Sequence, residues 1–177
     1  VALALIDARR RAGDNAGVES LLRALIARAT PSTVGMRWSQ LAGHLEQNKD
    51  TPGALEAWRQ ARTLDPSQAM AWSAEERILE AAGDFEALVD VLVAHASHPT
   101  AAGRRAGDLY ARAADLSQRF GLDAQAAQLA ERALRFMPED PSMLALLQKL
   151  AEERMEFDED AGDPTGEHAI PTTPPTA

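Results

Sequence analysis

The sequence predicts an all-α fold, an α-solenoid of antiparallel helix pairs with a C-terminal capping helix and an irregular tail. Three observations favour it. Large apolar residues recur at intervals of three and four, as they do on one face of a helix. A block of about 34 residues recurs along the chain. Residues that end or start helices, namely Gly-Asp and Lys-Asp pairs and prolines, separate the apolar blocks.

The most regular block covers residues 32–66. Two helices each present one apolar face, formed by Trp38, Leu41 and Leu45 and by Ala54, Trp58 and Ala61. Small residues at Ala42 and Ala54 let the two backbones approach closely, and Pro66 ends the second helix. We therefore expect helices over residues 33–47 and 51–64.

The block repeats over residues 67–100 and 104–138. Trp72 stands one repeat length after Trp38, although larger residues stand where the pattern expects small ones or a stop, at Glu76, Leu88, His95 and Thr100. The distance in sequence from Trp72 to Tyr110 is longer than one repeat length. This extra length indicates an insertion in Ser97–Gly103, where Pro99 and Gly103 indicate a loop. We expect helices over residues 68–82, 85–97, 102–120 and 123–136.

The two ends of the array differ from the regular block. Gly13-Asp14 precedes Lys49-Asp50 by close to one repeat length, so residues 1–31 hold a first copy, with helices over 1–12 and 15–29. Its first helix is expected to be truncated, as in a piece of a longer protein. Asp140-Pro141 is typical of a helix start, which predicts a capping helix over 141–155. The repeat domain is thus predicted to cover residues 1–155, followed by a tail or linker over 156–177.

These positions resemble the tetratricopeptide repeat (TPR), in the Ala- and Arg-rich form of bacterial proteins. The residues that carry the resemblance are Trp38, Leu41, Ala42, Leu45, Ala54, Trp58, Ala61 and Pro66. The resemblance implies a non-catalytic scaffold or adaptor in which the first helix of each pair lines a concave groove for a partner's peptide segment. Chaperone-binding members of that family hold a terminal carboxylate with a Lys and Asn clamp. Asn48-Lys49 lies in a turn here, which argues against that role.

The helical period, projected onto the first helix of each pair, gives the candidate groove residues. They are Arg37, Gln40, His44, Ser73, Arg77, Glu80, Arg104, Arg105, Asp108, Arg112, Asp115 and Arg119. Because arginine can hold a carboxylate through two parallel hydrogen bonds, this set favours a protein or peptide partner with acidic groups. The alternative is that these arginines pair with Asp and Glu one turn away.

Composition and charge limit the other functions. The chain has 177 residues and no cysteine, which removes disulfides, thiol catalysis and thiolate metal sites. No stretch approaches the ~18 apolar residues of a membrane span, so membrane insertion is not expected. No signal peptide is visible, and the cytoplasm is the default compartment. Residues 1–150 carry a net charge of −2 within a total of −9, so binding to nucleic acid is not expected.

The acidity of the chain belongs to its tail. Residues 151–177 carry a net charge of −7 and end in a Pro/Thr-rich run, a composition that buries little apolar surface. Two interpretations stay open. The tail is either a solvated linker, or it docks on Arg104, Arg105, Arg112 and Arg119, in its own molecule or in a neighbouring one, and supports self-association.

Other chemistry is weakly indicated. His95 and His98 lie three residues apart without a third ligand nearby, so helix-end histidines are favoured over a metal site. The three tryptophans occupy apolar repeat positions, which favours core packing over a stacking platform for bases. No glycine-rich phosphate loop or nucleophile motif is found, and the sequence predicts no enzyme activity, no cofactor and no metal.

Three functions remain open. The first is a protein–protein interaction module that binds a partner segment in the groove. The second is an architectural segment of a larger repeat protein that mediates self-association. The third is a regulatory domain fused to an enzyme outside this chain. A saturable complex with a peptide would favour the first, and concentration-dependent oligomers without a peptide would favour the second.

Overall fold

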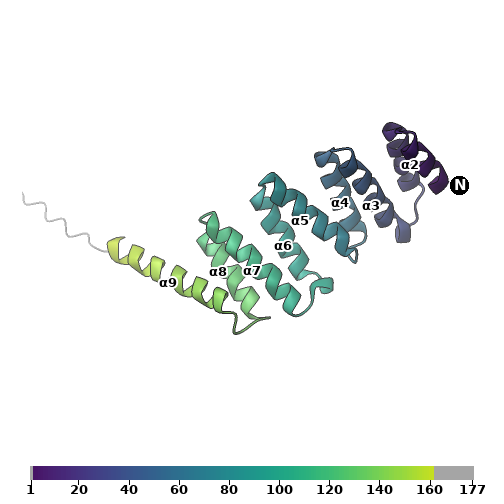
Figure 1. Cartoon of the computed structure of the whole chain (residues 1–177). Coiled ribbons are helices and arrows are strands. Elements are labelled where there is room, and N and C mark those ends of the chain that lie inside the picture. The colour runs from purple at the N-terminus through teal and green to yellow at the C-terminus, as the bar shows by residue number, and fades with distance from the viewer. Residues whose placement is uncertain (1, 162–177) are drawn as a thin grey trace, which may run out of the picture.

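The computed structural model describes residues 2–161, and the side chains of residues 4–155. This part of the chain is helical and contains no strand. Its elements are α1 (Ala2–Arg11), α2 (Asn15–Ala27), α3 (Pro31–Gln47), α4 (Thr51–Leu64), α5 (Ala69–Ala82), α6 (Phe85–Ser97), the 3-10 helix η1 (Pro99–Ala101), α7 (Arg104–Arg119), α8 (Asp123–Leu134) and α9 (Pro141–Ala161). Figure 1 shows them stacked in sequence order as an elongated array, with the N-terminus at one end and α9 at the other. None of the described helices is both long and apolar enough to cross a membrane.

The predicted all-α solenoid and the order of its helices are confirmed. Two details differ. The insertion forms η1 rather than an irregular loop, and Ala101 within it is buried. Helix α9 continues past residue 155 as far as Ala161, the last residue that the structure describes. Residues 151–161 contain Ala, Glu, Arg and Met and no Gly or Pro, and these strong helix formers explain why the helix continues into the acidic segment.

The turn within each helix pair follows from two adjacent residues. A residue with positive φ ends the first helix, at Gly13, Lys49, Gly83 and Gly121. In the first three turns an aspartate comes next, and its carboxylate accepts a backbone N–H at the start of the second helix. Asp50, for example, accepts from Gly53 N at 3.0 Å. The fourth turn has Leu122 at this position and no side-chain cap.

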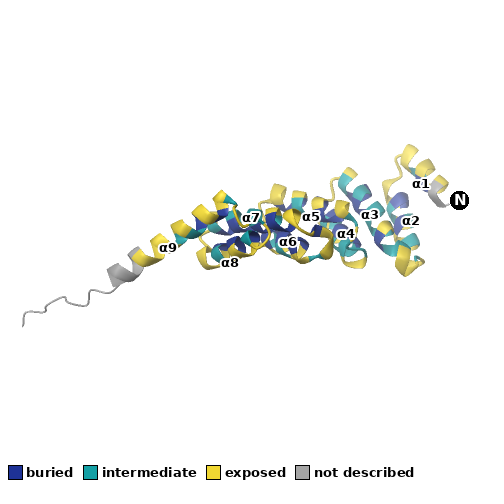
Figure 2. Ribbon diagram, turned by 90° about the horizontal axis from the view of Figure 1, so that it is seen from below, coloured by how far each residue is buried: buried dark blue, intermediate teal, exposed yellow. Residues whose placement is uncertain are grey.

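The core lies between the helices along the array and consists of two clusters of buried residues, and Figure 2 shows buried residues in dark blue along its length. Ala42 and Ala54 are buried, which confirms the close approach of α3 and α4. Helix α5 contributes to the core on both of its sides. Ala71 and Ile78 pack with α2, α3 and α4, while Trp72 and Leu79 pack with α6, α7 and α8. Each repeat is therefore stabilised by its neighbours.

The second copy, in which larger residues stand at positions where the pattern expects small ones, uses these residues in two ways. Leu88 is buried in the core. Glu76 and His95 form a polar pair, with His95 Nδ1 at 2.9 Å from Glu76 Oε1, and the His95 ring stacks on Trp72 at 4.5 Å. Glu76, Leu88 and His95 occupy positions that are alanine in the regular block. In this copy, helix α6 packs more extensively on α7 than on α5.

Candidate partner-binding face

The first helices of three successive pairs, α3, α5 and α7, form one surface, which we call the A-helix face. Two arginines connect these helices. Arg77 Nη2 on α5 lies 2.6 Å from Glu46 Oε2 on α3. Arg112 on α7 lies 3.1 Å from Glu76 Oε2 and 2.9 Å from Glu80 Oε2, both on α5. The side chains of consecutive first helices therefore meet directly, as the repeat pattern predicts.

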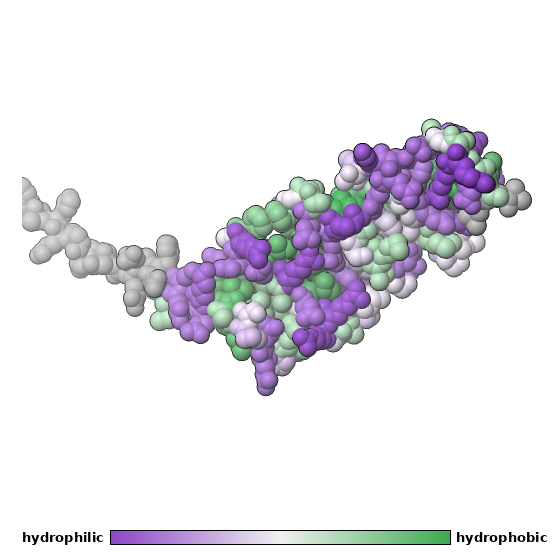
Figure 3. Space-filling view, viewed as in Figure 1, coloured by the Kyte–Doolittle hydropathy of each residue, from purple (hydrophilic) through white to green (hydrophobic). Residues whose placement is uncertain are grey.

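The outer surface of the array mixes polar and apolar side chains. Figure 3 shows one side of the molecule, on which small hydrophobic areas in green lie between hydrophilic residues in purple. Among the described residues, the exposed large hydrophobic side chains include Met36, Met70 and Phe120, which belong to three different pairs or turns. Candidate binding sites are therefore places where such an apolar group lies beside a charged one.

A hollow of about 470 Å³ lies between α3 and α5 on the A-helix face. Glu46 is fixed at its edge, because one carboxylate oxygen accepts from Trp58 Nε1 and the other from Arg77. The Arg77 side chain is 60% exposed. Met70, in the first turn of α5, lines the same hollow and is 68% exposed. The hollow thus combines a charged group and an apolar group, both open to solvent.

The junction of α4 with α5 is held by one buried carboxylate and two partly exposed arginines. Glu75 is almost fully buried and accepts from Arg59 Nε at 3.0 Å and from Arg62 Nε at 2.6 Å. The Arg62 guanidinium also lies over the Trp72 ring, 4.6 Å from its centroid. These contacts satisfy a buried carboxylate and hold α4 against α5, so their role is structural.

The structure brings some of the predicted groove residues together. Ser73 and Arg77 line the hollow between α3 and α5, and Glu80 meets Arg112 across α5 and α7. Arg37 Nη1 donates to Gln40 Oε1 at 2.9 Å in the middle of α3, whereas Glu46 lies in its last turn. No contact in the described part of the chain joins this pair to the hollow.

The candidates on α7 are largely engaged with each other. Arg119 pairs with Asp115 at 2.7 Å, and Arg104 lies 4.0 Å from Asp108. Arg105 Nη2 lies 3.5 Å from His95 Nε2. Most candidate arginines therefore have a partner within the protein, which favours the alternative that they pair with nearby carboxylates.

His44 does not line a groove, so its assignment as a candidate was wrong. The side chain is 2% exposed. Its Nε2 lies 3.1 Å from the Asn15 carbonyl oxygen of α2 and 3.0 Å from Asn48 Nδ2. His44 is flanked on α3 by the core positions Leu41 and Leu45, and this face of the helix meets α2. The buried side chain instead joins α3 to the start of α2.

Two residues of the hollow were missed from the sequence. Glu46 lies next to the core position Leu45, and its contacts to the Trp58 indole and to Arg77 explain why its carboxylate faces the hollow. Met70 is apolar but falls outside the core stripe of α5. An apolar residue off the stripe is a usable signal for an exposed contact.

Two further expectations concern metal ions and the acidic tail. Within the described residues, no group of three or more His, Asp or Glu side chains is placed to hold a metal ion. Docking of the tail on Arg104, Arg105, Arg112 and Arg119 was one of the two interpretations left open. The tail beyond Ala161 and the side chains of residues 156–161 lie outside the described residues.

No protein-family model and no curated protein matches the chain. Solved structures similar to it include a crystal structure of BtubC (BKLC) from P. vanneervenii, with 18% identity and a TM-score of 0.45 over 99% of this chain and 84% of that one. A crystal structure of MamA protein shows 15% identity and a TM-score of 0.47, over 98% and 96%. A Podosopora anserina putative kinesin light chain with nearly identical TPR-like repeats shows 17% identity and a TM-score of 0.41, over 89% and 87%.

These TM-scores are below 0.5, so the type of repeat is assigned from the chain's own spacing and packing. Antiparallel helix pairs recur at the spacing of the repeat, small residues lie where the helices of the regular pair cross, and consecutive first helices meet side by side. The described part of the chain is an α-solenoid of antiparallel helix pairs.

Proposed function

We propose that this chain is a non-catalytic protein–protein interaction module that binds an extended partner segment on its A-helix face. The hollow between α3 and α5 is the centre of the proposed site. The observation that supports it most is the exposed Arg77, held beside an exposed Met70 by a carboxylate that the protein itself fixes.

The chemistry of a fitting segment follows from these side chains. The contact to Glu46 uses one N–H of Arg77, and a guanidinium carries five N–H donors. A carboxylate on the partner can therefore bind the same guanidinium. Met70 and Ala74 offer apolar surface beside it, which suits an aliphatic side chain. The ligand we propose is an extended segment with an acidic residue next to an aliphatic one.

Rigidity also supports binding at this place. Glu46 and Arg77 are held in position by contacts to Trp58 and to each other, so little side-chain freedom is lost when a segment binds. By contrast, Arg112 already contacts two carboxylates. We therefore expect Arg112 to position the helices and Arg77 to contact the partner.

The test starts from peptides selected on the immobilised protein from a displayed random library, with affinities measured by fluorescence anisotropy. Arg77→Ala should weaken binding of the selected peptides by about tenfold, the value of one charge-assisted hydrogen bond. The matched control is Arg23→Ala, which removes an exposed arginine of α2 that pairs with Glu19. Equal affinities for the wild type, Arg77→Ala and Arg23→Ala would refute the site.

A second function, self-association through the C-terminal end of the array, is favoured by one observation. Helix α9 exposes Leu144 and Met155, and a hollow of about 870 Å³ between α8 and α9 is lined partly by Leu147 and Leu150. If this end pairs with another copy, light scattering will show dimers at micromolar concentrations, and Leu144→Lys will return them to monomers. A monomer at all concentrations would leave the interaction module as the function.

A further inference from the structure

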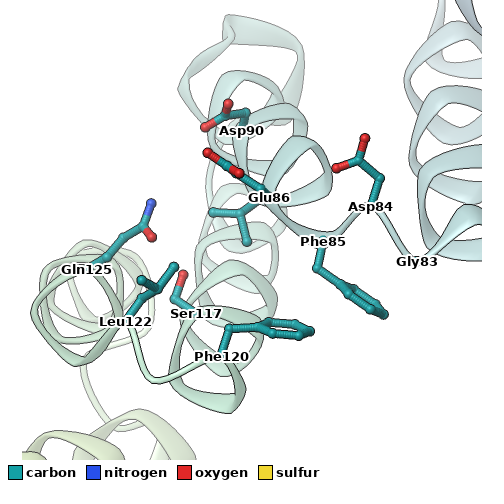
Figure 4. Close-up of a pocket in the computed structure, with 10 residues that line it drawn as sticks. Gly83, Asp84, Phe85, Glu86, Asp90, Ser117, Phe120, Leu122 and Gln125 are labelled. Atoms are coloured by element: carbon teal, nitrogen blue, oxygen red, sulfur yellow. The ribbon is translucent and has the colours of Figure 1, made fainter.

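We propose a second binding site, separate from the A-helix face, that takes the apolar side chain of a basic peptide segment. The site is a cavity of about 700 Å³ where the start of α6 meets the end of α7 and the start of α8. We call it the turn pocket, and Figure 4 shows its side chains. Its chemistry is carried by Phe85, Glu86, Asp90, Ser117, Phe120 and Leu122.

Ser117 occupies a position where the preceding copies have a core leucine. It lies as far after Leu79 as Tyr110 lies after Trp72, and Leu79 in turn lies one repeat length after Leu45. Both leucines are buried, and Ser117 is fully buried as well. Serine is smaller than leucine, and Ser117 lines the turn pocket. Its hydroxyl has no hydrogen-bond partner among the described residues, and Figure 4 shows it directed into the pocket beside Leu122.

Leu122 is the second departure from the repeat pattern at this place. The equivalent residues in the other three turns are Asp14, Asp50 and Asp84, and each of them caps the following helix. Leu122 makes no cap contact and is 47% exposed. The turn thus lacks a stabilising cap and instead places an exposed apolar side chain in the wall of the pocket.

Ser117 and Leu122 both lower stability relative to residues that follow the repeat pattern, and both line the same cavity. A buried hydroxyl without a partner and a missing helix cap each cost free energy. Local departures from an otherwise consistent pattern concentrate at functional sites. Their coincidence at the turn pocket indicates that the pocket has a use that offsets the cost.

The walls and the rim of the pocket define the chemistry of its occupant. Phe85 and Phe120 stack at 4.7 Å, and Phe120 is 51% exposed. One repeat earlier, where the start of α4 meets the end of α5, the equivalent positions hold Thr51 and Ala82. The aromatic wall is therefore absent from that earlier junction. Apolar walls of this kind suit an aliphatic or aromatic side chain.

The rim is acidic. Asp84, Glu86 and Asp90 line the pocket, and none of them forms an ion pair with a cation among residues 4–155. Figure 4 shows Glu86 and Asp90 together at one side of the opening and Asp84 at another. Carboxylates at several places around the opening are complementary in charge to a peptide that carries Lys or Arg on both sides of an apolar residue.

The probe is a fluorescein-labelled peptide with a central Leu, Phe or Trp between lysines, compared with matched peptides that carry glutamates in place of the lysines. Fluorescence anisotropy should show binding of the lysine peptides and not of the glutamate peptides. The double variant Glu86→Gln, Asp90→Asn should weaken binding by about two- to fivefold for each carboxylate, with a smaller effect at high salt.

The decisive variant is Ser117→Leu, which restores the repeat pattern and fills the pocket. It should raise the urea midpoint while weakening the lysine peptides by about tenfold or more. Leu122→Asn, which supplies a cap, should do the same to a smaller degree. Ser117→Ala keeps the volume and is the matched control, so it should retain most of the binding.

Two results would overturn the proposal. One is equal affinity of wild-type protein for the lysine and glutamate peptides, and the other is wild-type affinity in the Ser117→Leu variant. Arg77→Ala belongs to the A-helix face and should leave binding of the lysine peptides unchanged. Failure of either site is therefore detected independently of the other.

Discussion

Trp58 joins the core of the array to the proposed binding face, and its removal is the most informative single change. The side chain is 4% exposed and packs in the N-terminal half of the core. Its indole N–H donates to Glu46, the carboxylate that holds Arg77. Trp58→Ala therefore removes a large apolar group and releases the position of an exposed arginine.

The magnitude follows from burial. A tryptophan buries about 150–250 Å², which at about 25 cal/mol per Å² corresponds to roughly 4–6 kcal/mol. Measured substitutions of large aromatic residues by alanine cost about 3–5 kcal/mol, and we expect a value in that range here. Neighbouring Ala54 and Ala61 are small and fully buried, so they cannot fill the cavity that the substitution leaves.

Urea denaturation followed by circular dichroism measures this loss. Trp58→Phe is the control, because it keeps most of the apolar area and removes the hydrogen bond, for an expected loss of about 1 kcal/mol. A loss below about 1 kcal/mol for Trp58→Ala, far under the range for a buried aromatic, would mean that the register of the repeat is wrong.

Three further changes test other parts of the array. Asp50→Ala removes the cap of α4 and should lower the free energy of unfolding by about 1 kcal/mol in the same assay. Glu75→Gln weakens two charge-assisted hydrogen bonds from Arg59 and Arg62 and should cost about 2 kcal/mol, whereas an unchanged urea midpoint would show that these bonds add nothing. Hydrogen bonds from Ser67 and then Gln68 hold the pKa of Asp65 below its usual range. The ionised Asp65 carboxylate therefore stabilises the protein at neutral pH, and this stabilisation is lost as the pH falls below 3.8 toward the lowered pKa. The difference in thermal midpoint between wild type and Asp65→Asn should shrink over that pH interval.

The helix order could be predicted from the sequence because each element carries redundant local signals. The turn before α4, for example, combines the aspartate cap Asp50 with Pro52 in the first turn of the helix and with apolar faces on both flanking helices. The end of α9 could not be placed, because its acidic residues fit either a helix or a solvated tail. Local propensity decided in favour of the helix.

The candidate face was harder to predict than the fold. Helical periodicity placed Ser73 and Arg77 beside the same hollow, yet it also assigned the buried His44 to the surface. A period fixes the direction of a side chain to within a fraction of a turn, and His44 lies at the boundary between two faces. Which arginines are already paired depends on residues of other helices, such as Glu46 for Arg77, and spacing alone does not reveal such contacts.

The turn pocket shows how the repeat pattern itself can indicate function. Ser117 and Leu122 look ordinary when each is considered alone. Compared with Leu79 and Asp84, one copy earlier, both are departures from the pattern, and the structure places them in the walls of one cavity. Aligning the third copy with the second, allowing for the insertion between them, would have found both from the sequence.

Site-specific photo-crosslinking tests the central claim, that partners bind the A-helix face, most directly. A photoreactive amino acid is placed at Ser73 on α5, or at the exposed Gln128 on α8, which is a second helix of its pair. Each protein is irradiated with the library-selected peptide, and the products are resolved by mass spectrometry. We expect a crosslink to the peptide from position 73 and none from position 128. A crosslink from position 128 alone would contradict the assignment of the binding face.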